Sequence, residues 1–339
     1  MSTQLGFFTE PAPEPASPRA EHLALTRRLP PGFRVGTSTW SFPGWDGIVW
    51  SGPADKARLA RDGLSAYAAH PLLRLVGVDR SWYAPVPEHE MARWVEQVPG
   101  DFRFVVKAAR MLTEPRGPDD APNPFFLDAD WAMRHVMGPA ASGLGSRLGV
   151  VVLQFTPGLV AHTDSPAAFA DRLHDFLLGV GGIAPVAVEL RSPGLLGDEY
   201  AAALSDAGAS HCFAVHPSMP EPAEQLSRLG GVAAGPLVVR WMLRRNRRYE
   251  EAKADYAPFD RLAEPDPGIR DQVAELVLDA AAAGRPSLVS INNKAEGSAP
   301  LSAFALAEAV AGRWNAQSSE ASHSSSEPSL MSSNRNVER

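Results

Sequence analysis

The sequence predicts an α/β fold, a (β/α)8 barrel of the TIM type with disordered ends. Eight short apolar runs alternate with helical patterns along the chain, which indicates either a closed barrel or a doubly wound open sheet. Several runs, such as 150–153, are apolar at successive positions, which is typical of parallel strands covered on both faces. No Gly-x-Gly-x-x-Gly motif follows the first run, so the dinucleotide-binding open sheet loses support and the barrel is favoured.

The expected strands and helices follow from local patterns. The strands are expected at 33–38, 74–79, 102–107, 149–155, 185–190, 211–215, 236–241 and 286–292. Ser165-Pro166 and Asp266-Pro267 are each typical of a helix N-cap followed by a first-turn proline. Further helices are expected over 91–98 and 298–312, because apolar residues recur there at helical spacing.

The 339-residue chain is expected to form one domain over 32–314, between disordered tails at 1–31 and 315–339. The first tail is rich in proline and the second in serine, so neither buries enough apolar surface to offset the entropy of ordering. A single cysteine, Cys212, excludes an internal disulfide, and no run of about 18 apolar residues is present to span a membrane. We therefore expect a cytoplasmic protein without a membrane partner.

Seven blocks in order carry a resemblance that covers nearly the whole expected domain. They are Gly36-Thr37-Ser38-Thr39-Trp40-Ser41, Val76-Gly77-Val78-Asp79-Arg80-Ser81-Trp82-Tyr83, Phe102-Arg103-Phe104-Val105-Val106-Lys107, Leu153-Gln154-Phe155, Val188-Glu189-Leu190-Arg191-Ser192, Val239-Arg240 and Ile291-Asn292-Asn293. Together they resemble the domain-of-unknown-function-72 family, also called YecE-like. The resemblance implies a TIM-type barrel and, because the family has no assigned activity, it implies no reaction.

Several positions depart from the pattern of that family, so the chain is expected to be a divergent member. The second-strand block has Gly77 and Asp79 where the family usually has Glu-x-Asn. Glu114 stands where a histidine usually follows the third block, and His216 lies near the end of the sixth strand, where an aspartate is usual. Trp241 follows the seventh block, which usually continues into histidine and glycine.

Charged residues lie at or just after the carboxyl ends of the expected strands, where TIM-type barrels hold their active sites. Glu189 and Arg191 are two positions apart and share a face, either as a general base and an anion clamp or as a structural ion pair. Lys107, the second candidate catalytic residue, either binds an anion or forms a Schiff base; the alternative is an ion pair with Asp79 or Glu189. Arg240 is expected to clamp an anion.

Polar and aromatic residues near the same strand ends complete the expected substrate site. Asn292 and Asn293 either orient a substrate hydroxyl or carbonyl or take part in a turn. Trp40 and Tyr83 are candidates for stacking on a sugar or base, with packing as the alternative. The residues expected to bind substrate are Trp40, Asp79, Tyr83, Gln154, Arg191, Arg240, Asn292 and Asn293.

The leading hypothesis is an enzyme, or former enzyme, that acts on a small anionic or sugar-like substrate without a metal or redox cofactor. His211 and His216 lie on opposite faces of one expected strand, so no metal site is expected from them. The second hypothesis is a nucleic-acid-associated protein that uses the basic cluster from Arg244 to Arg248, which the net charge of −7 disfavours. The third is a non-catalytic ligand-binding or scaffold barrel.

Overall fold

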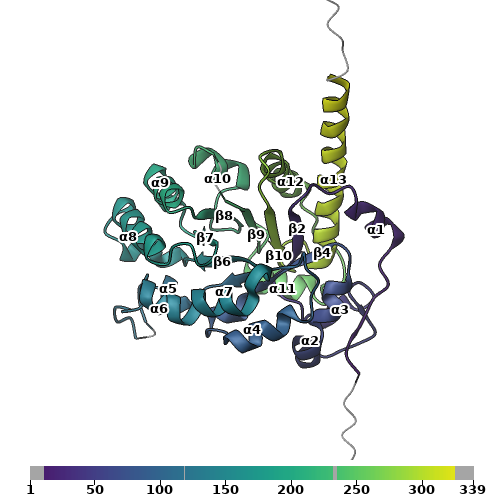
Figure 1. Cartoon of the computed structure of the whole chain (residues 1–339), viewed down its shortest axis with the longest axis horizontal. Helices are drawn as coiled ribbons and strands as arrows, with labels where there is room; N and C mark the ends of the chain where they lie inside the picture. Colours follow the sequence, from purple (N-terminus) through teal and green to yellow (C-terminus); the bar gives the residue numbers. More distant parts are fainter. Residues whose placement is uncertain (1–10, 118, 232–234, 325–339) are drawn as a thin grey trace, which may run out of the picture.

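The computed structural model describes residues 11–117, 119–231 and 235–324. Its centre is a closed barrel of eight parallel strands in the order β10-β2-β4-β5-β6-β7-β8-β9, with helices around the outside (Figure 1). The strands are β2 (Phe33–Thr37), β4 (Leu73–Val78), β5 (Arg103–Lys107), β6 (Leu148–Gln154), β7 (Val186–Glu189), β8 (Ser210–Val215), β9 (Leu237–Trp241) and β10 (Ser287–Ile291). The closed barrel of parallel strands confirms the predicted fold class. Each strand begins and ends within one residue of its expected position.

Two of the helices begin at the caps that the sequence predicts. They are α1 (Ala20–Thr26), α2 (Lys56–Asp62), α3 (Leu64–Ala69), α4 (Glu88–Val95), α5 (Arg110–Thr113), α6 (Ala129–Ala132), α7 (Gly138–Leu144), α8 (Pro166–Gly179), α9 (Asp198–Asp206), α10 (Pro222–Arg228), α11 (Tyr249–Tyr256), α12 (Pro267–Ala282) and α13 (Ala299–Ser324). Ser165 Oγ accepts a hydrogen bond from the Ala168 N–H at 3.0 Å, and Asp266 Oδ1 accepts one from the Ile269 N–H at 3.2 Å. The predicted starts of α8 and α12 are therefore confirmed.

Part of the expected N-terminal tail is ordered, which differs from the disorder predicted for 1–31. The short strand β1 (Glu14–Pro15) pairs antiparallel with β3 (Trp50–Ser51), and α1 buries His22. The His22 ring lies 4.5 Å from the ring of Phe304 on α13, a long-range contact that local composition does not reveal. Helix α13 likewise continues beyond residue 315. The remaining parts of both expected tails, 1–10 and 325–339, lie outside the described residues.

The barrel interior holds an apolar layer, and the side chains that follow it reach the carboxyl rim. The layer consists of Leu75, Val105, Val150, Val152, Ala187, Cys212, Val238 and Leu288. Because side chains alternate across a strand, residues two positions further along face the same interior. Those residues are Gly77, Lys107, Gln154, Glu189, Ala214, Arg240 and Ser290. The alternation therefore brings polar side chains from separate strands together at one end of the barrel.

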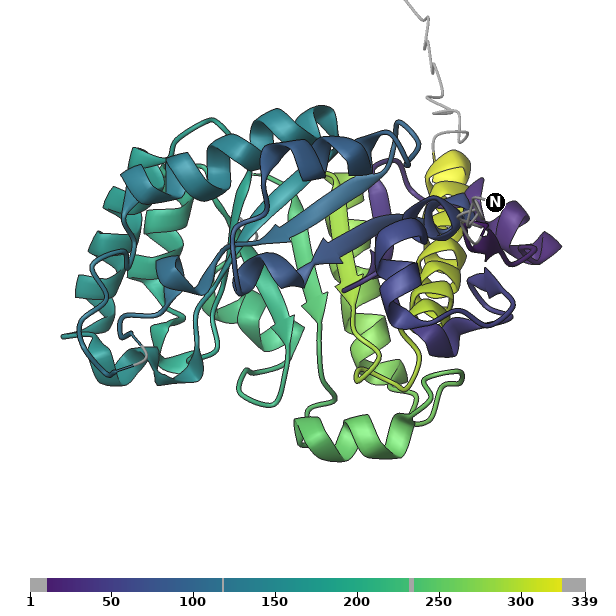
Figure 2. The same ribbon diagram turned by 90° about the horizontal axis from the view of Figure 1, so that it is seen from below.

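Helix α11 belongs to the loop that follows β9, and it lies beyond the carboxyl ends of β9 and β10 (Figure 2). A small apolar cluster of Leu243, Ala252, Tyr256 and Phe259 packs this helix against the loop after β2, through Phe42. The loop after β9 is thereby held beside the rim. None of the helices within the described residues combines the length and the hydropathy that a membrane crossing requires.

Candidate functional site

Arg240 is the centre of a buried polar network at the carboxyl rim. Its Nη1 donates to Gln154 Oε1 at 2.9 Å and to Glu189 Oε2, and its Nη2 donates to Asp79 Oδ1 at 2.6 Å. Arg191 donates from Nε to Glu189 Oε1 at 2.7 Å. The side chains of Glu189, Arg191 and Arg240 are 0%, 6% and 3% exposed. The structure therefore joins five predicted site residues, from or just after β4, β6, β7 and β9, in one network.

Glu189 is the charged partner of two arginines at neutral pH. Burial raises the pKa of its carboxyl group, but the guanidinium groups of Arg191 and Arg240 outweigh burial and lower that pKa to about 2. Burial also lowers the pKa of Arg240, while Asp79 and Glu189 raise it above its ordinary value. A carboxylate with so low a pKa and both oxygens occupied is a poor proton acceptor near neutral pH. The geometry therefore favours the ion-pair interpretation of Glu189 over the general-base interpretation.

Lys107 is the rim cation that the network leaves without a carboxylate. Within the described residues no carboxylate oxygen lies at ion-pairing distance from its Nζ, which lies 4.4 Å from the centre of the Trp82 ring. Burial, followed by the charge of Arg240, lowers the pKa of Lys107 to about 8, although Asp79 and Glu189 act in the opposite direction. The alternative ion pair with Asp79 or Glu189 is thus not formed, because Arg240 and Arg191 occupy both carboxylates.

A hollow of about 340 Å³, here called the rim hollow, opens above this network. Its lining residues are Asp79, Trp82, Tyr83, Lys107, Gln154, Pro157, Arg191, His216, Arg240, Met242, Leu243, Tyr249 and Asn292. The three cations Lys107, Arg191 and Arg240 face the two carboxylates Asp79 and Glu189, which leaves a net charge of +1 with histidine neutral. An anionic ligand compensates such a positive charge.

Three predicted site residues do not line the rim hollow. Glu189 lies beneath it, in the network described above. Trp40 lines a separate hollow of about 670 Å³ that shares Asp79 and Tyr83 with the rim hollow. Asn293 Oδ1 accepts hydrogen bonds from Trp45 Nε1 at 3.1 Å and from the Ala299 N–H at 2.9 Å. The local geometry of Asn293 thus favours the turn interpretation, whereas Asn292 lines the rim hollow.

Six residues of the rim hollow were not among the predicted site residues. These are Trp82, Pro157, His216, Met242, Leu243 and Tyr249. Trp82 directly precedes the predicted Tyr83, so the same strand end could have identified it. Tyr249 begins α11 and is held at the rim by Lys294, whose Nζ lies 4.2 Å from the centre of its ring. No local pattern indicates that α11 would return to the rim.

The two histidines of β8 and its end take separate roles, as their alternation predicts. His211 contacts Tyr200 at 2.9 Å and Gln225 at 3.0 Å on the outer face of the barrel, whereas His216 lines the rim hollow. Burial lowers the pKa of His216 to about 4, so its ring is neutral at neutral pH. Its Nδ1 accepts from the Ser218 N–H at 3.2 Å, which places the ring proton on Nε2. No group of three or more metal-binding side chains is found within the described ranges.

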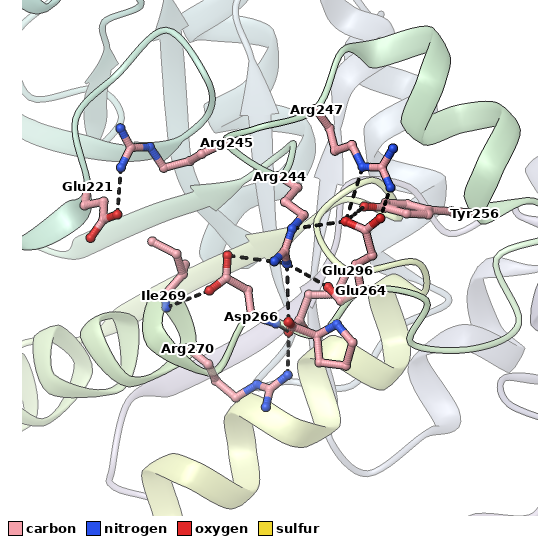
Figure 3. A network of polar contacts seen from close by, with 11 residues as sticks. Glu221, Arg244, Arg245, Arg247, Tyr256, Glu264, Asp266, Ile269, Arg270 and Glu296 are labelled. Carbon is pink, nitrogen blue, oxygen red and sulfur yellow. Dashed lines mark hydrogen bonds and ion pairs between the residues drawn. The ribbon is translucent and has the colours of Figure 1, made fainter.

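The basic cluster from Arg244 to Arg248 lies among carboxylates. Figure 3 shows the acidic side chains around Arg244, Arg245 and Arg247. The ion pairs are Arg244 with Glu264 and Asp266, Arg245 with Glu221, and Arg247 with Glu264 and Asp255. Arg248 is 88% exposed and lies 4.0 Å from Glu251. Because neighbouring carboxylates compensate these cations, the cluster gives little support to the nucleic-acid hypothesis, which stays a prediction.

Gly77 faces the barrel interior and is closely approached by Ser38 and Ser290. A Cβ atom at this position would lie 3.0 Å from Ser38 Cα and 3.2 Å from Ser290 Oγ, which is tighter than ordinary packing. The glutamate that the family pattern leads us to expect there would have to displace both neighbours. Ala214 and Ser290, which pair in register with Arg240 on either side, are also small. Close packing by Ser38 and Ser290 therefore accounts for glycine at position 77.

Comparisons with known proteins extend the resemblance found in the sequence. The family model described as "Protein of unknown function DUF72" matches residues 34–327. A solved DUF72 family protein from Enterococcus faecalis V583 is 18% identical with a TM-score of 0.58, over 82% of this chain and 95% of that chain. One from Thermotoga maritima MSB8 is 18% identical with a TM-score of 0.51, over 81% and 98%. No curated protein matches the chain. At these identities the likeness to solved structures shows the fold alone.

Proposed function

Since the chain belongs to the DUF72 family, whose description assigns no activity, we propose its function from the rim hollow itself. The protein binds a small anionic molecule in this hollow, and Lys107 transfers a proton to or from the bound molecule. The observation that carries the proposal is the charge balance at the rim. Arg191 and Arg240 share the two carboxylates, and the ammonium group of Lys107 has no carboxylate partner among the described residues.

The three cations support distinct parts of this function. Arg191 directs Nε and Nη2 to the carboxylate of Glu189. Its Nη1 has no carboxylate partner in the described part of the chain, so the edge of the guanidinium that carries Nη1 can receive an anion. Lys107 has a pKa of about 8, close enough to neutrality for the group to donate and accept a proton during a reaction. Arg240 directs both terminal nitrogens inward and positions Asp79 and Gln154.

Glu189 is assigned a positioning role in place of the general-base role. Its carboxylate holds Arg191 and Arg240 in place, and Arg191 then presents its remaining edge to the hollow without a conformational search. This arrangement leaves Lys107 as the group at the rim with a pKa near neutrality, because His216 titrates at about 4.

A binding protein without turnover is the second candidate function. The occupied oxygens of Glu189 favour it, because they remove the carboxylate base that many proton-transfer reactions use. A broad screen of anionic metabolites, each followed for chemical change by mass spectrometry, distinguishes the two candidates. Binding together with conversion supports the enzyme, and binding without conversion supports the second candidate.

Sulfate binding measured by isothermal titration calorimetry at neutral pH tests the proposed site. Wild-type protein is expected to bind sulfate, and Lys107→Met to bind it at least about tenfold more weakly, because one charge-assisted contact is lost. Lys253→Met is the matched control, since Lys253 is exposed on α11 and pairs with Glu250. The proposal fails if wild type does not bind sulfate, or if the two lysine variants bind it equally.

A further inference from the structure

A second hollow adjoins the rim hollow and differs from it in chemistry. It measures about 670 Å³ and lies between the ends of β2 and β4 and helices α2 and α4. We call it the aromatic hollow, and its lining includes Trp40, Ala57, Ala60, Asp79, Tyr83 and Trp94. Asp79 and Tyr83 line both hollows, so the two hollows adjoin at these side chains.

The aromatic side chains of the aromatic hollow suit a flat group. The centres of the Trp40 and Trp94 rings lie 5.3 Å apart at 70°, and both side chains are buried in the wall, whereas Tyr83 at the shared edge is 76% exposed. Among the charged residues of the lining, Arg80 pairs with Glu90, Asp79 with Arg240 and Arg61 with Asp62, while Lys56 adds an exposed cation on α2. An exposed aromatic side chain such as Tyr83 binds planar rings by stacking and apolar contact.

Resting on the proposed anion site, we propose that the natural ligand is a two-part molecule. Its phosphate or carboxylate group lies in the rim hollow beside Lys107 and Arg191, and an attached planar ring lies in the aromatic hollow against Tyr83. The class of ligand is therefore an anion that carries an aromatic ring, rather than a free inorganic anion. Asp79 and Tyr83 lie where the two halves of the site adjoin.

Two probes with the same head group separate the two halves of this ligand. Phenyl phosphate carries a ring and methyl phosphate does not, so their difference in affinity reports the ring alone. Wild-type protein is expected to bind phenyl phosphate about tenfold more tightly, within the range measured for stacking on an aromatic side chain. Isothermal titration calorimetry measures both dissociation constants.

A variant that fills the aromatic hollow locates the ring. Ala60→Trp adds bulk from an exposed position on α2 without removing a contact from the core, and Ala57→Trp does so from the same helix. Either variant is expected to abolish the tenfold advantage of phenyl phosphate and to leave methyl phosphate binding unchanged. Ala168→Trp is the matched control, on an exposed position of α8 that lines neither hollow, and keeps the advantage. Thermal unfolding verifies that each variant is folded.

The outcomes separate this inference from the proposed function. Equal binding of the two phosphates to wild-type protein, with methyl phosphate binding lost in Lys107→Met, overturns the ring site and supports the anion site. A phenyl advantage that survives in both Ala57→Trp and Ala60→Trp also overturns it, since the ring then lies elsewhere. If neither phosphate binds, the anion site itself fails and the ring site fails with it.

Discussion

Glu189 and Arg240 form an ion pair inside the barrel although the whole of β8 separates their strands in the sheet. Arg191 occupies the other oxygen of the same carboxylate. Burying such charges is costly, but removing one partner costs more, because the remaining charges are then buried without compensation. The pair is therefore a fixed part of the fold, and the group that the network leaves uncompensated, Lys107, is the one assigned to the ligand.

The structural role of Glu189 predicts a large effect on stability. Glu189→Gln keeps the volume of the side chain and removes the charge that Arg191 and Arg240 face, so the free energy of unfolding should fall by about 3–5 kcal/mol. Urea unfolding measures the change. Glu250→Gln is the control, because Glu250 is 77% exposed and its replacement should cost less than about 0.5 kcal/mol. A Glu189→Gln protein as stable as wild type would contradict the structural role.

The same substitution should lose its effect in acid. Folding lowers the pKa of Glu189 from 4.5 to about 2, because Arg191 and Arg240 outweigh the opposing effect of burial. A carboxylate of this kind stabilises the fold above its unfolded pKa, and that stabilisation is lost as the pH falls from 4.5 towards 2. The difference in unfolding free energy between wild type and Glu189→Gln should therefore shrink between about pH 5 and about pH 3. A difference that stays constant over this interval would refute the assigned charge state.

Sulfate affinity should fall as the pH rises through about 8, the pKa to which burial and Arg240 lower Lys107. Below this pH the ammonium group is charged and attracts the anion; above it the neutral amine does not, and the loss should be about tenfold or more. Sulfate keeps its own charge over the interval. Calorimetric titrations at several pH values measure the step, which Lys107→Met should lack. A step of equal size in that variant would assign the titration to another group.

The two neighbouring asparagines should behave differently. Asn293→Ala leaves the indole N–H of Trp45 and the backbone N–H of Ala299 without their acceptor. The free energy of unfolding should therefore fall by about 1–3 kcal/mol. Sulfate affinity should stay unchanged, because Asn293 does not line the rim hollow. The experiment is urea unfolding together with calorimetry. Weaker sulfate binding by a protein of undiminished stability would return Asn293 to the ligand site.

The strands were predictable because each is a short apolar run between helical patterns, and parallel strands covered on both faces have that composition. Once the strands are placed, alternation and barrel closure bring Lys107, Gln154, Glu189 and Arg240 to one end. The polar residues of the rim are thus encoded in short stretches of sequence, and only their convergence needs the closed fold.

The partners of those residues were not predictable, because long-range competition decides them. Sequence left Lys107 free to pair with Asp79 or Glu189, but Arg240, from a distant part of the chain, reaches both carboxylates. Asn292 and Asn293 have the same local pattern, but the hydrogen bonds from Trp45 and Ala299 engage Asn293 away from the rim hollow. The order in α1 depends in the same way on the contact of His22 with α13.

A crystal soaked in selenate locates the proposed anion site, because the anomalous signal of selenium marks the anion without prior assumptions. A selenium peak is expected in the rim hollow, within hydrogen-bonding distance of Lys107 Nζ and the free edge of Arg191. Selenate found only at other surfaces, with the hollow open and Lys107 in its present position, would contradict the assignment of this hollow as an anion site.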